Sequence, residues 1–280
     1  MPTITGVADR QTTASLHVIS DVSDNLVRAR STATPLSSFP GLLPRDTQTA
    51  YAIQTNSIGN WPDEVGGWKV GGITPAFREH FAAERLAGPI FSSQIVQISD
   101  GHDVTMTVFD GGFAAIEAEF IIKTAKPVGP KNFDTSNLHL EDLVASIHVG
   151  AEIASSPLAG INDIGPGAII SDFGNNAGLV IGPEISRWQE RSSDPVDITV
   201  EVDGKTVGSI TRSIGDDALA AFGFLVDLTR SRGLTIPAGT YVTCGALSGI
   251  HDVAPGVESN VVFGGLAEFS VSFARRYPTT

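Results

Sequence analysis

The chain has 280 residues, of which 41% are hydrophobic, and a formal net charge of −13 at pH 7. This composition is that of a globular protein with a sizeable buried core. The acidic excess argues against a nucleic-acid partner and against a basic membrane-binding surface, because both require clustered Lys and Arg. No window reaches the roughly 18 apolar residues that a membrane span needs, so we expect no membrane partner.

The N-terminal segment, residues 1–20, has no apolar core of the signal-peptide type. The one cysteine, Cys244, cannot form a disulfide within the chain. Together these observations predict a cytoplasmic protein.

The first 65 residues are expected to form a helical N-terminal region. The spacing of apolar residues predicts a helix over 22–31, with Ser23 or Asp24 as its N-cap, and a second helix over 47–59. Residues 1–20 are polar, and we expect them to be loosely ordered. From residue 66 to residue 280 the chain changes character, and we predict one continuous globular unit there.

Strands dominate the part of the chain after residue 65. Alternating or apolar runs bounded by Gly or Asp-Gly predict strands over 67–72, 89–98, 103–109, 113–122 and 148–154. Helices are predicted over 74–88, 140–147 and 216–233. A hairpin is predicted over 196–213, because Asp203-Gly204 is a dipeptide typical of a type I′ turn. Strands and hairpins outnumber strand–helix–strand units, so the predicted fold class is α+β, mixed and β-dominated.

Two glutamates, Glu117 and Glu119, lie within the otherwise apolar run FAAIEAEFII at 113–122. Residues two apart in a strand point the same way and lie about 6.5–7 Å apart, so both carboxylates would share one face. Both faces of this strand are apolar, which disfavours a solvated edge strand. Because burying two unpaired carboxylates side by side is costly, we expect a positive group near them.

Three interpretations of this pair stay open: a divalent metal site, a structural ion pair with Lys or Arg, or a surface strand. A third glutamate, Glu152, lies in the small, apolar run HVGAEIASSP at 148–157. Three carboxylates without cysteines or paired histidines suit Mg²⁺ or Mn²⁺ better than Zn²⁺. Lys69, in the segment GWKVGG, is either a further site residue or an exposed lysine lying along a strand.

Several short segments follow one another in the order found in a known family. They are AYAIQ (50–54), GWKVGGITPA (67–76), GPIF (88–91), IEAEF (116–120), AEI (151–153), GLVIG (178–182) and the C-terminal LTIPAGTYVTCGAL, APG and FGGLAEFSVSF. On these segments the chain resembles the 2-keto-4-pentenoate hydratase and 4-oxalocrotonate decarboxylase branch of the fumarylacetoacetate hydrolase superfamily.

The resemblance implies a β-sandwich-like roll, a homo-oligomer and a bound Mg²⁺ or Mn²⁺. The E-x-E metal ligands of the family fall on Glu117 and Glu119, and its third acidic ligand falls on Glu152. The lysine of its G-x-K-x-G segment, an active-site residue in this branch, falls on Lys69. The implied activity is that of a lyase of aromatic compound catabolism, a hydratase or decarboxylase that acts on a 2-keto (2-hydroxydienoic) acid through a metal-stabilised enolate.

Three segments depart from the family pattern. The family's Asp-aromatic-Gly, Asp-Asn-Ala-Ser and Thr-Gly-Ser are here Leu86-Ala87-Gly88, Asn175-Asn176-Ala177-Gly178 and Cys244-Gly245-Ala246. We expect polar groups that hold a small hydroxydienoate to be missing at each place. The metal ligands are intact, so the departures concern the substrate.

His80 and Glu84 are four residues apart in the predicted helix 74–88, so they are expected to share a helix face. The hydrolase branch of the superfamily uses a His-Glu pair on a lid segment to activate water. An acylpyruvate-type C–C bond hydrolase is therefore the second functional hypothesis, against the alternative that the pair is exposed and inert. A third hypothesis, based on the departures above, is a non-catalytic partner subunit of a hydratase–decarboxylase complex.

Overall fold

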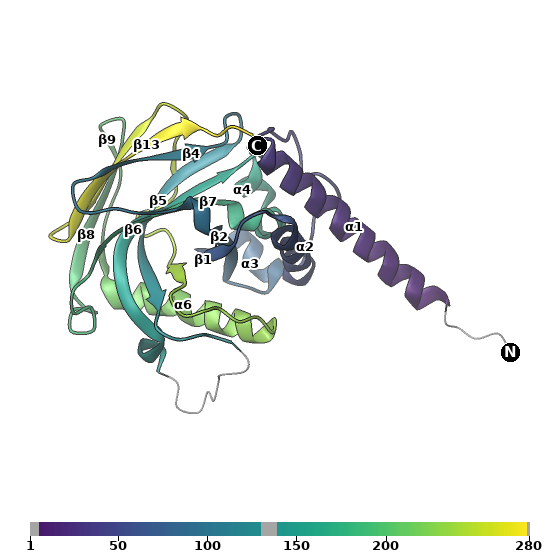
Figure 1. Ribbon diagram of the computed structural model, residues 1–280, viewed down its shortest axis with the longest axis horizontal. Coiled ribbons are helices and arrows are strands. Elements are labelled where there is room, and N and C mark those ends of the chain that lie inside the picture. Colours follow the sequence, from purple (N-terminus) through teal and green to yellow (C-terminus); the bar gives the residue numbers. More distant parts are fainter. Residues whose placement is uncertain (1–5, 130–138, 279–280) are drawn as a thin grey trace.

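The computed structural model describes residues 6–129 and 139–278, with side chains described from residue 16 onward. Two curved β-sheets lie against each other, and helix α6 (Ile214–Ser231) runs along one side of them (Figure 1). The remaining helices gather at the end away from strands β8 (Pro195–Val202) and β9 (Lys205–Ser213). This mixed architecture confirms the predicted fold class.

The larger sheet contains the strands on which the three glutamates lie. Its strand order is β2-β1-β10-β5-β6-β7-β3, with β11 paired to β5. Strands β5 and β6 pair antiparallel from Phe113 to Thr124 and form the middle of the sheet. The members are β1 (Val65–Gly72), β2 (Arg85–Phe91), β3 (Ile95–Gln97), β5 (Phe113–Thr124), β6 (Val144–Ser156), β7 (Asn176–Glu184), β10 (Tyr241–Thr243) and β11 (His251–Asp252).

The smaller sheet covers one side of the core, with the strand order β4-β13-β12-β8-β9. The β8–β9 hairpin turns at Asp203 and Gly204, whose φ angles are 48° and 71°. Both angles are positive, as a type I′ turn requires, so this prediction is confirmed. The other members are β4 (Asp103–Val108), β12 (Glu258–Phe263) and β13 (Ala267–Arg275).

The helices near the N-terminus pack on one end of the larger sheet. Helix α2 (Thr47–Asn60) agrees with the predicted helix over 47–59, and the side chain of its N-cap, Asp46, accepts a hydrogen bond from the Thr49 amide at 2.7 Å. The long C-terminal helix is also confirmed as α6, which buries Phe222 and Leu225. The remaining α-helices are α1 (Gly6–Ser31), α3 (Pro75–Phe81), α4 (Ile161–Ile164) and α5 (Pro166–Ser171).

Several predicted elements have wrong bounds. Helix α1 begins at Gly6, so residues 6–20 are helical rather than loosely ordered; residues 1–5 lie outside the described residues. The predicted helix 74–88 ends at Phe81, because Ala82 is left-handed with φ 48° and the residues from Arg85 onward pair with β1. A 3-10 turn at Ser92–Gln94 interrupts the strand predicted over 89–98. The helix predicted over 140–147 is a short 3-10 turn that leads into β6.

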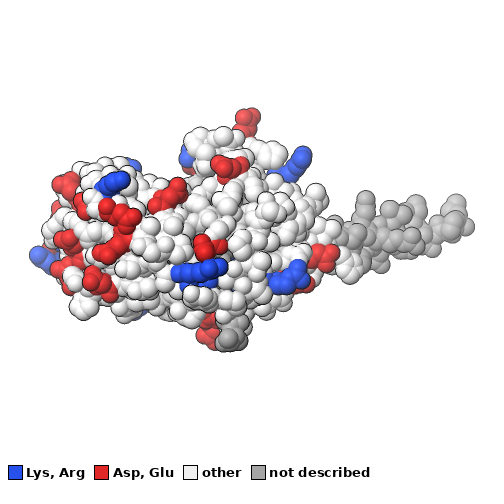
Figure 2. Space-filling view, turned by 90° about the horizontal axis from the view of Figure 1, so that it is seen from above, with Lys and Arg blue, Asp and Glu red and all other residues white. Residues whose placement is uncertain are grey.

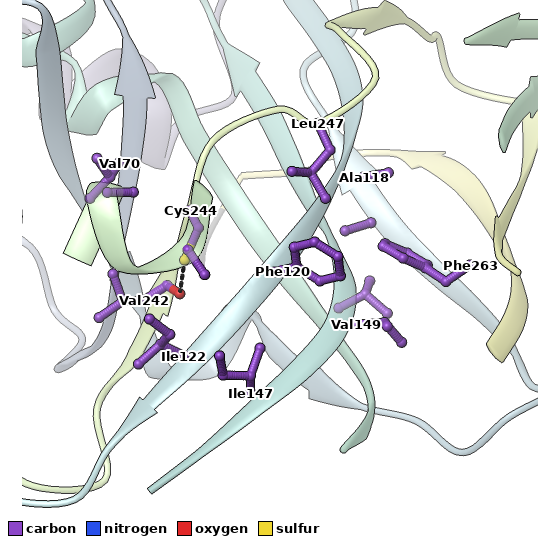
Figure 3. Packing of buried hydrophobic residues seen from close by; sticks show 14 of the residues in the cluster. Val70, Ala118, Phe120, Ile122, Ile147, Val149, Val242, Cys244, Leu247 and Phe263 are labelled. Atoms are coloured by element: carbon purple, nitrogen blue, oxygen red, sulfur yellow. Dashed lines mark hydrogen bonds between the residues drawn. The ribbon is translucent and has the colours of Figure 1, made fainter. Parts of the chain in front are cut away.

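Side-chain alternation along β5 separates the hydrophobic core from the glutamates. Ala118, Phe120 and Ile122 belong to the main hydrophobic core, where the ring of Phe120 lies 5.8 Å from that of Phe263 on the smaller sheet (Figure 3). Glu117 and Glu119 point to the opposite face, because side chains alternate along a strand. A closely packed hydrocarbon core therefore lies directly behind the strand that holds the two carboxylates.

Acidic side chains gather at the end of the molecule formed by the smaller sheet (Figure 2). A depression in this region is lined by four acidic residues, Glu201, Asp203, Glu258 and Glu268. This surface accords with the net negative charge of the chain. Within the described ranges, we find no helix with the length and apolar character needed to traverse a bilayer.

Candidate metal and substrate site

Three buried glutamates meet on one face of the larger sheet. Glu117 on β5 is the register partner of Glu152 on β6, and Glu119 follows two residues along β5. One carboxylate oxygen from each residue lies within 4.8 Å of the oxygens of the other two. Glu117 is 4% exposed and the other two are 0% exposed. This burial rules out the interpretation of the pair as part of a solvated surface strand.

An apolar floor lies beside the glutamates on the same face of the sheet. Ile121 follows Glu119 along β5, and Leu179 on β7 is the register partner of Glu152. Both belong to a small buried cluster with Ile90, Ile181 and Tyr241. The aliphatic side chains of this floor cannot replace the hydrogen bonds of water to the neighbouring carboxylates, so they make ionised carboxylates costly here.

Lys69 on β1 supplies the positive group closest to the glutamates. Its side chain is buried, which rules out the exposed lysine considered from the sequence. The ammonium lies 3.6 Å from Glu152 Oε1 and donates a hydrogen bond to Asn175 Oδ1 at 3.2 Å. The structure therefore brings the four residues expected from the family pattern, Lys69 and the three glutamates, into one cluster.

The pKa shifts show that the positive charge of one lysine does not compensate the negative charges of three carboxylates. Burial raises the pKa of Glu117 to about 7, and the charge of Glu152 adds to that rise. Burial, with the neighbouring charges of Glu152 and Glu117, also raises the pKa of Glu119 well above its usual value. Burial acts to lower the pKa of Lys69, but the three carboxylates outweigh this effect and raise it. The cluster therefore favours bound protons or an additional cation.

The donor atoms of this cluster fit a hard divalent cation. Glu152 accepts hydrogen bonds from Asn176 Nδ2 at 3.0 Å and from Thr243 Oγ1 at 3.3 Å, which orient its carboxylate. Glu119 Oε2 accepts one from the Gly245 amide at 2.6 Å, while its buried Oε1 has no hydrogen-bond partner among the described residues. An all-oxygen set with an unsatisfied buried oxygen is a suitable site for Mg²⁺ or Mn²⁺.

A cavity of about 380 Å³ opens onto this cluster. Lys69, Glu117 and Asn175 line it on the cluster side, and two arginines, Arg85 and Arg212, also line it. Arg212 lies 3.8 Å from Asp217, whereas no carboxylate of the described residues lies within 4.0 Å of Arg85. The other lining residues are Gly71, Gly72, Thr74, Leu86, Asn162, Ile169, Asp217, Cys244, Gly245, Ala246, Leu247 and Ile250.

The segment that departs from the family's Asp-Asn-Ala-Ser contributes polar groups to the site. Asn175 contacts Lys69, and Asn176 contacts Glu152. Both contacts are with Lys69 and Glu152, so the expectation that groups holding a small hydroxydienoate are missing at this place stays a prediction. Neither contact follows from a local pattern, since the partners of these asparagines lie on strands far away in the chain. Arg85 is not among the predicted site residues either, because the sequence pattern places it inside the helix expected over 74–88.

His80 and Glu84 do not share a helix face, contrary to the prediction. His80 lies in the last turn of α3, whereas Glu84 follows the left-handed Ala82 and precedes β2. Both side chains are exposed. They lie on the segment between Thr74 and Arg85, two residues that line the cavity. Their segment thus borders the cavity, but no hydrogen bond between the two side chains is present.

The comparisons with known proteins agree with the family resemblance. No family model matches the chain. The solved structure of 4-oxalocrotonate decarboxylase from Pseudomonas putida G7, complexed with calcium and acetate, superposes with a TM-score of 0.71 at 20% identity. The superposition covers 92% of this chain and 97% of that one. The chain has the fumarylacetoacetate hydrolase fold.

The sequence match is shorter than the structural one. The 4-oxalocrotonate decarboxylase of Pseudomonas putida is 26% identical over 165 residues, which cover 56% of this chain and 59% of that relative. A fumarylpyruvate hydrolase from Pseudomonas aeruginosa, in complex with Mn²⁺ and pyruvate, has a TM-score of 0.52 at 16% identity, covering 75% of this chain and 89% of that one. The predicted resemblance to the hydratase and decarboxylase branch is confirmed by these matches.

Proposed function

We propose that the protein is a divalent-metal-dependent lyase that acts on a 2-keto acid, by decarboxylation or hydration. The observation that supports this proposal most is the buried cluster of three carboxylates with Lys69 at a cavity. The names of the similar proteins support decarboxylation ahead of hydration. Solved structures of the 4-oxalocrotonate decarboxylase contain calcium or magnesium, and that of the fumarylpyruvate hydrolase contains Mn²⁺. These are cations that prefer oxygen ligands such as the carboxylates found here.

In this proposal Glu117, Glu119 and Glu152 hold Mg²⁺ or Mn²⁺, which supplies a Lewis acid for the keto acid oxygens. In the metal-free cluster, the three carboxylates raise the pKa of Lys69 and favour its cationic form. When a carboxylate that is β or vinylogous to the keto group leaves as CO₂, the electron pair of the broken C–C bond moves to the keto oxygen. The Lys69 ammonium can stabilise that negative charge and can donate a proton to the oxygen. Asn175 holds the ammonium in place, and the apolar floor keeps bulk water from competing.

The two arginines of the cavity favour a substrate with a second carboxylate. 4-Oxalocrotonate has a carboxylate at each end, and Arg85 has no carboxylate partner within 4.0 Å among the described residues. We therefore expect Arg85→Gln to raise the KM for 4-oxalocrotonate by about tenfold or more, since a charged hydrogen bond is lost. The affinity for pyruvate, which has no distal carboxylate, is expected to stay unchanged.

A turnover assay tests the proposed function directly. 4-Oxalocrotonate, 2-hydroxypentadienoate and oxaloacetate are offered to the protein with Mg²⁺, with Mn²⁺ or with EDTA. We expect metal-dependent turnover of at least one of them, and a loss of more than about 100-fold in Glu119→Gln. Glu190→Gln is the matched control, because Glu190 is exposed and, among the described residues, its one ion pair is with Arg187. Turnover that persists in EDTA, or no turnover of any keto acid, would refute the proposal.

A C–C bond hydrolase is the second candidate function. The segment with His80 and Glu84 borders the cavity, and a fumarylpyruvate hydrolase shares the fold. Against this candidate, the two side chains are exposed and are separated by the end of α3. Four expectations from the sequence stay predictions. They are the homo-oligomer, a partner enzyme of the same pathway, the non-catalytic partner role and the cytoplasmic location.

A further inference from the structure

Arg30, near the end of helix α1, is a buried charge outside the cluster of Lys69 and the three glutamates. It is 3% exposed, and its guanidinium pairs with Asp172 through Nε–Oδ1 at 2.5 Å and Nη2–Oδ2 at 2.9 Å. Ser156, on the same strand as Glu152, donates a further hydrogen bond to Asp172 Oδ2 at 2.6 Å. Removing one partner of such a buried pair leaves an uncompensated charge, so the whole arrangement depends on Arg30.

The guanidinium also binds the backbone at both ends of the segment 172–176. Nη2 donates to the Asp172 carbonyl at 3.0 Å, and Nη1 donates to the Asn176 carbonyl at 2.9 Å. A third bond, from Nη2 to the Ser155 carbonyl at 3.1 Å, ties the segment to β6. One planar group thus holds the two ends of a five-residue segment at a set separation from the strand of Glu152.

The segment between these ends has a strained backbone. Phe173, Gly174 and Asn175 have φ angles of 54°, 67° and 55°, all in the left-handed region. Two of them are not glycine, and such residues persist only where the surrounding structure holds them. Arg30 does so through its hydrogen bonds and also lies over the ring of Phe173, 5.2 Å from its centroid. We conclude that the conformation of this segment requires external support and that Arg30 provides much of it.

The two residues that this segment presents are those that contact the site. Asn175 Oδ1 accepts from the Lys69 ammonium, and Asn176 Nδ2 donates to Glu152 Oε1. We propose that Arg30 is a positioning residue for Lys69 and Glu152, an inference that rests on the metal site of the proposed function. It acts through the backbone of residues 172–176, and it makes the end of helix α1 part of the support of the site.

Two measurements on the full chain test this assignment. Mn²⁺ affinity is measured by titration for the wild type, Arg30→Gln and Arg30→Lys, and amide hydrogen exchange is followed at Asn175, whose amide donates to the Asp172 carbonyl. Loss of groups that orient metal ligands costs about 10–100-fold in affinity, and we expect this range for both variants. A lysine retains the charge but cannot span the segment, so Arg30→Lys should not rescue the affinity. Arg28→Gln, an exposed position on the same helix, should match the wild type.

The expected exchange result separates positioning from a loss of overall stability. The Asn175 amide should exchange faster in Arg30→Gln, while the amides of helix α6 keep the wild-type rate. If Arg30→Gln does not fold, Ser156→Ala removes one hydrogen bond to Asp172 and should give the same effects in smaller measure. In combination with Asn176→Ala, the affinity loss of Arg30→Gln should be less than additive, because both act on Glu152.

The outcomes keep the two proposals apart. A wild type that does not bind Mn²⁺ refutes the metal site, and the exchange measurement then still decides whether Arg30 holds the segment. A wild type that binds Mn²⁺, with unchanged affinity in folded Arg30→Gln, overturns the positioning role and leaves the proposed function intact. Unchanged exchange at Asn175 in that variant also overturns it.

Discussion

Glu117 and Glu152 lie directly opposite each other on neighbouring antiparallel strands, and both are buried on the same face of the sheet. This pairing places two like charges beside an apolar floor, with one ammonium, that of Lys69, 3.6 Å from Glu152. The free energy of folding without a metal must therefore depend on how many of the carboxylates hold a proton.

The metal-free protein is expected to lose stability as the pH rises. The pKa of Glu117 is about 7 in the folded chain against 4.5 as its ordinary value, so its stabilising contribution is complete below pH 4.5 and lost as the pH passes 7. The shift corresponds to about 3 kcal/mol. Urea unfolding in EDTA, at several pH values, should show the wild type losing this amount relative to Glu117→Gln. A difference that does not change with pH would contradict the prediction.

Lys69→Met separates the roles of the ammonium in catalysis and in metal binding. The substitution removes the repulsion between the Lys69 ammonium and an entering cation, so Mn²⁺ should bind more tightly to the variant than to the wild type. Turnover should fall by about 10²–10⁴-fold, the usual contribution of a positioned acid or base. Titration with Mn²⁺ and a steady-state assay measure the two effects. Weaker Mn²⁺ binding would show instead that Lys69 orders the glutamates.

His80→Ala and Glu84→Gln distinguish the lyase from the hydrolase. Both side chains are exposed, and we expect each variant to retain wild-type turnover of the keto acids. Cleavage of an acylpyruvate is measured in parallel. Abolition of that cleavage by His80→Ala, with keto acid turnover unchanged in Lys69→Met, would establish the hydrolase in place of the lyase.

Gly88 is expected to be required for the close packing of the segment 172–176. A Cβ atom at Gly88 would lie 2.2 Å from the Phe173 carbonyl oxygen, so Gly88→Ala should lower the free energy of unfolding by about 2–3 kcal/mol. At Gly59, in helix α2, no atom of the described residues outside the surrounding helix backbone lies within 4 Å of such a Cβ, and Gly59→Ala should raise the free energy of unfolding by about 0.5 kcal/mol. Urea unfolding of both variants checks the opposite signs, and equal effects would contradict the packing argument.

Local patterns along the chain were enough to predict much of the fold. The Asp203-Gly204 turn, the helices α2 and α6 and the strand of Glu117 and Glu119 follow from residues close together in sequence. The predicted helix over 74–88 failed because pairing with β1 outweighed the helical pattern after Ala82. Such an outcome is expected where a tertiary contact competes with a local preference.

By itself, the sequence determined that two carboxylates share one apolar strand face, because alternation along a strand is a local property. With the family pattern it also indicated Glu152 and Lys69. Only the tertiary structure decided what surrounds them: the apolar floor, the contacts of Asn175 and Asn176, and the support of that segment by Arg30. These contacts join residues more than 20 positions apart, and Arg30 lies 146 residues from Asn176. Their partners are chosen by the packing of strands and helices, which no local pattern encodes.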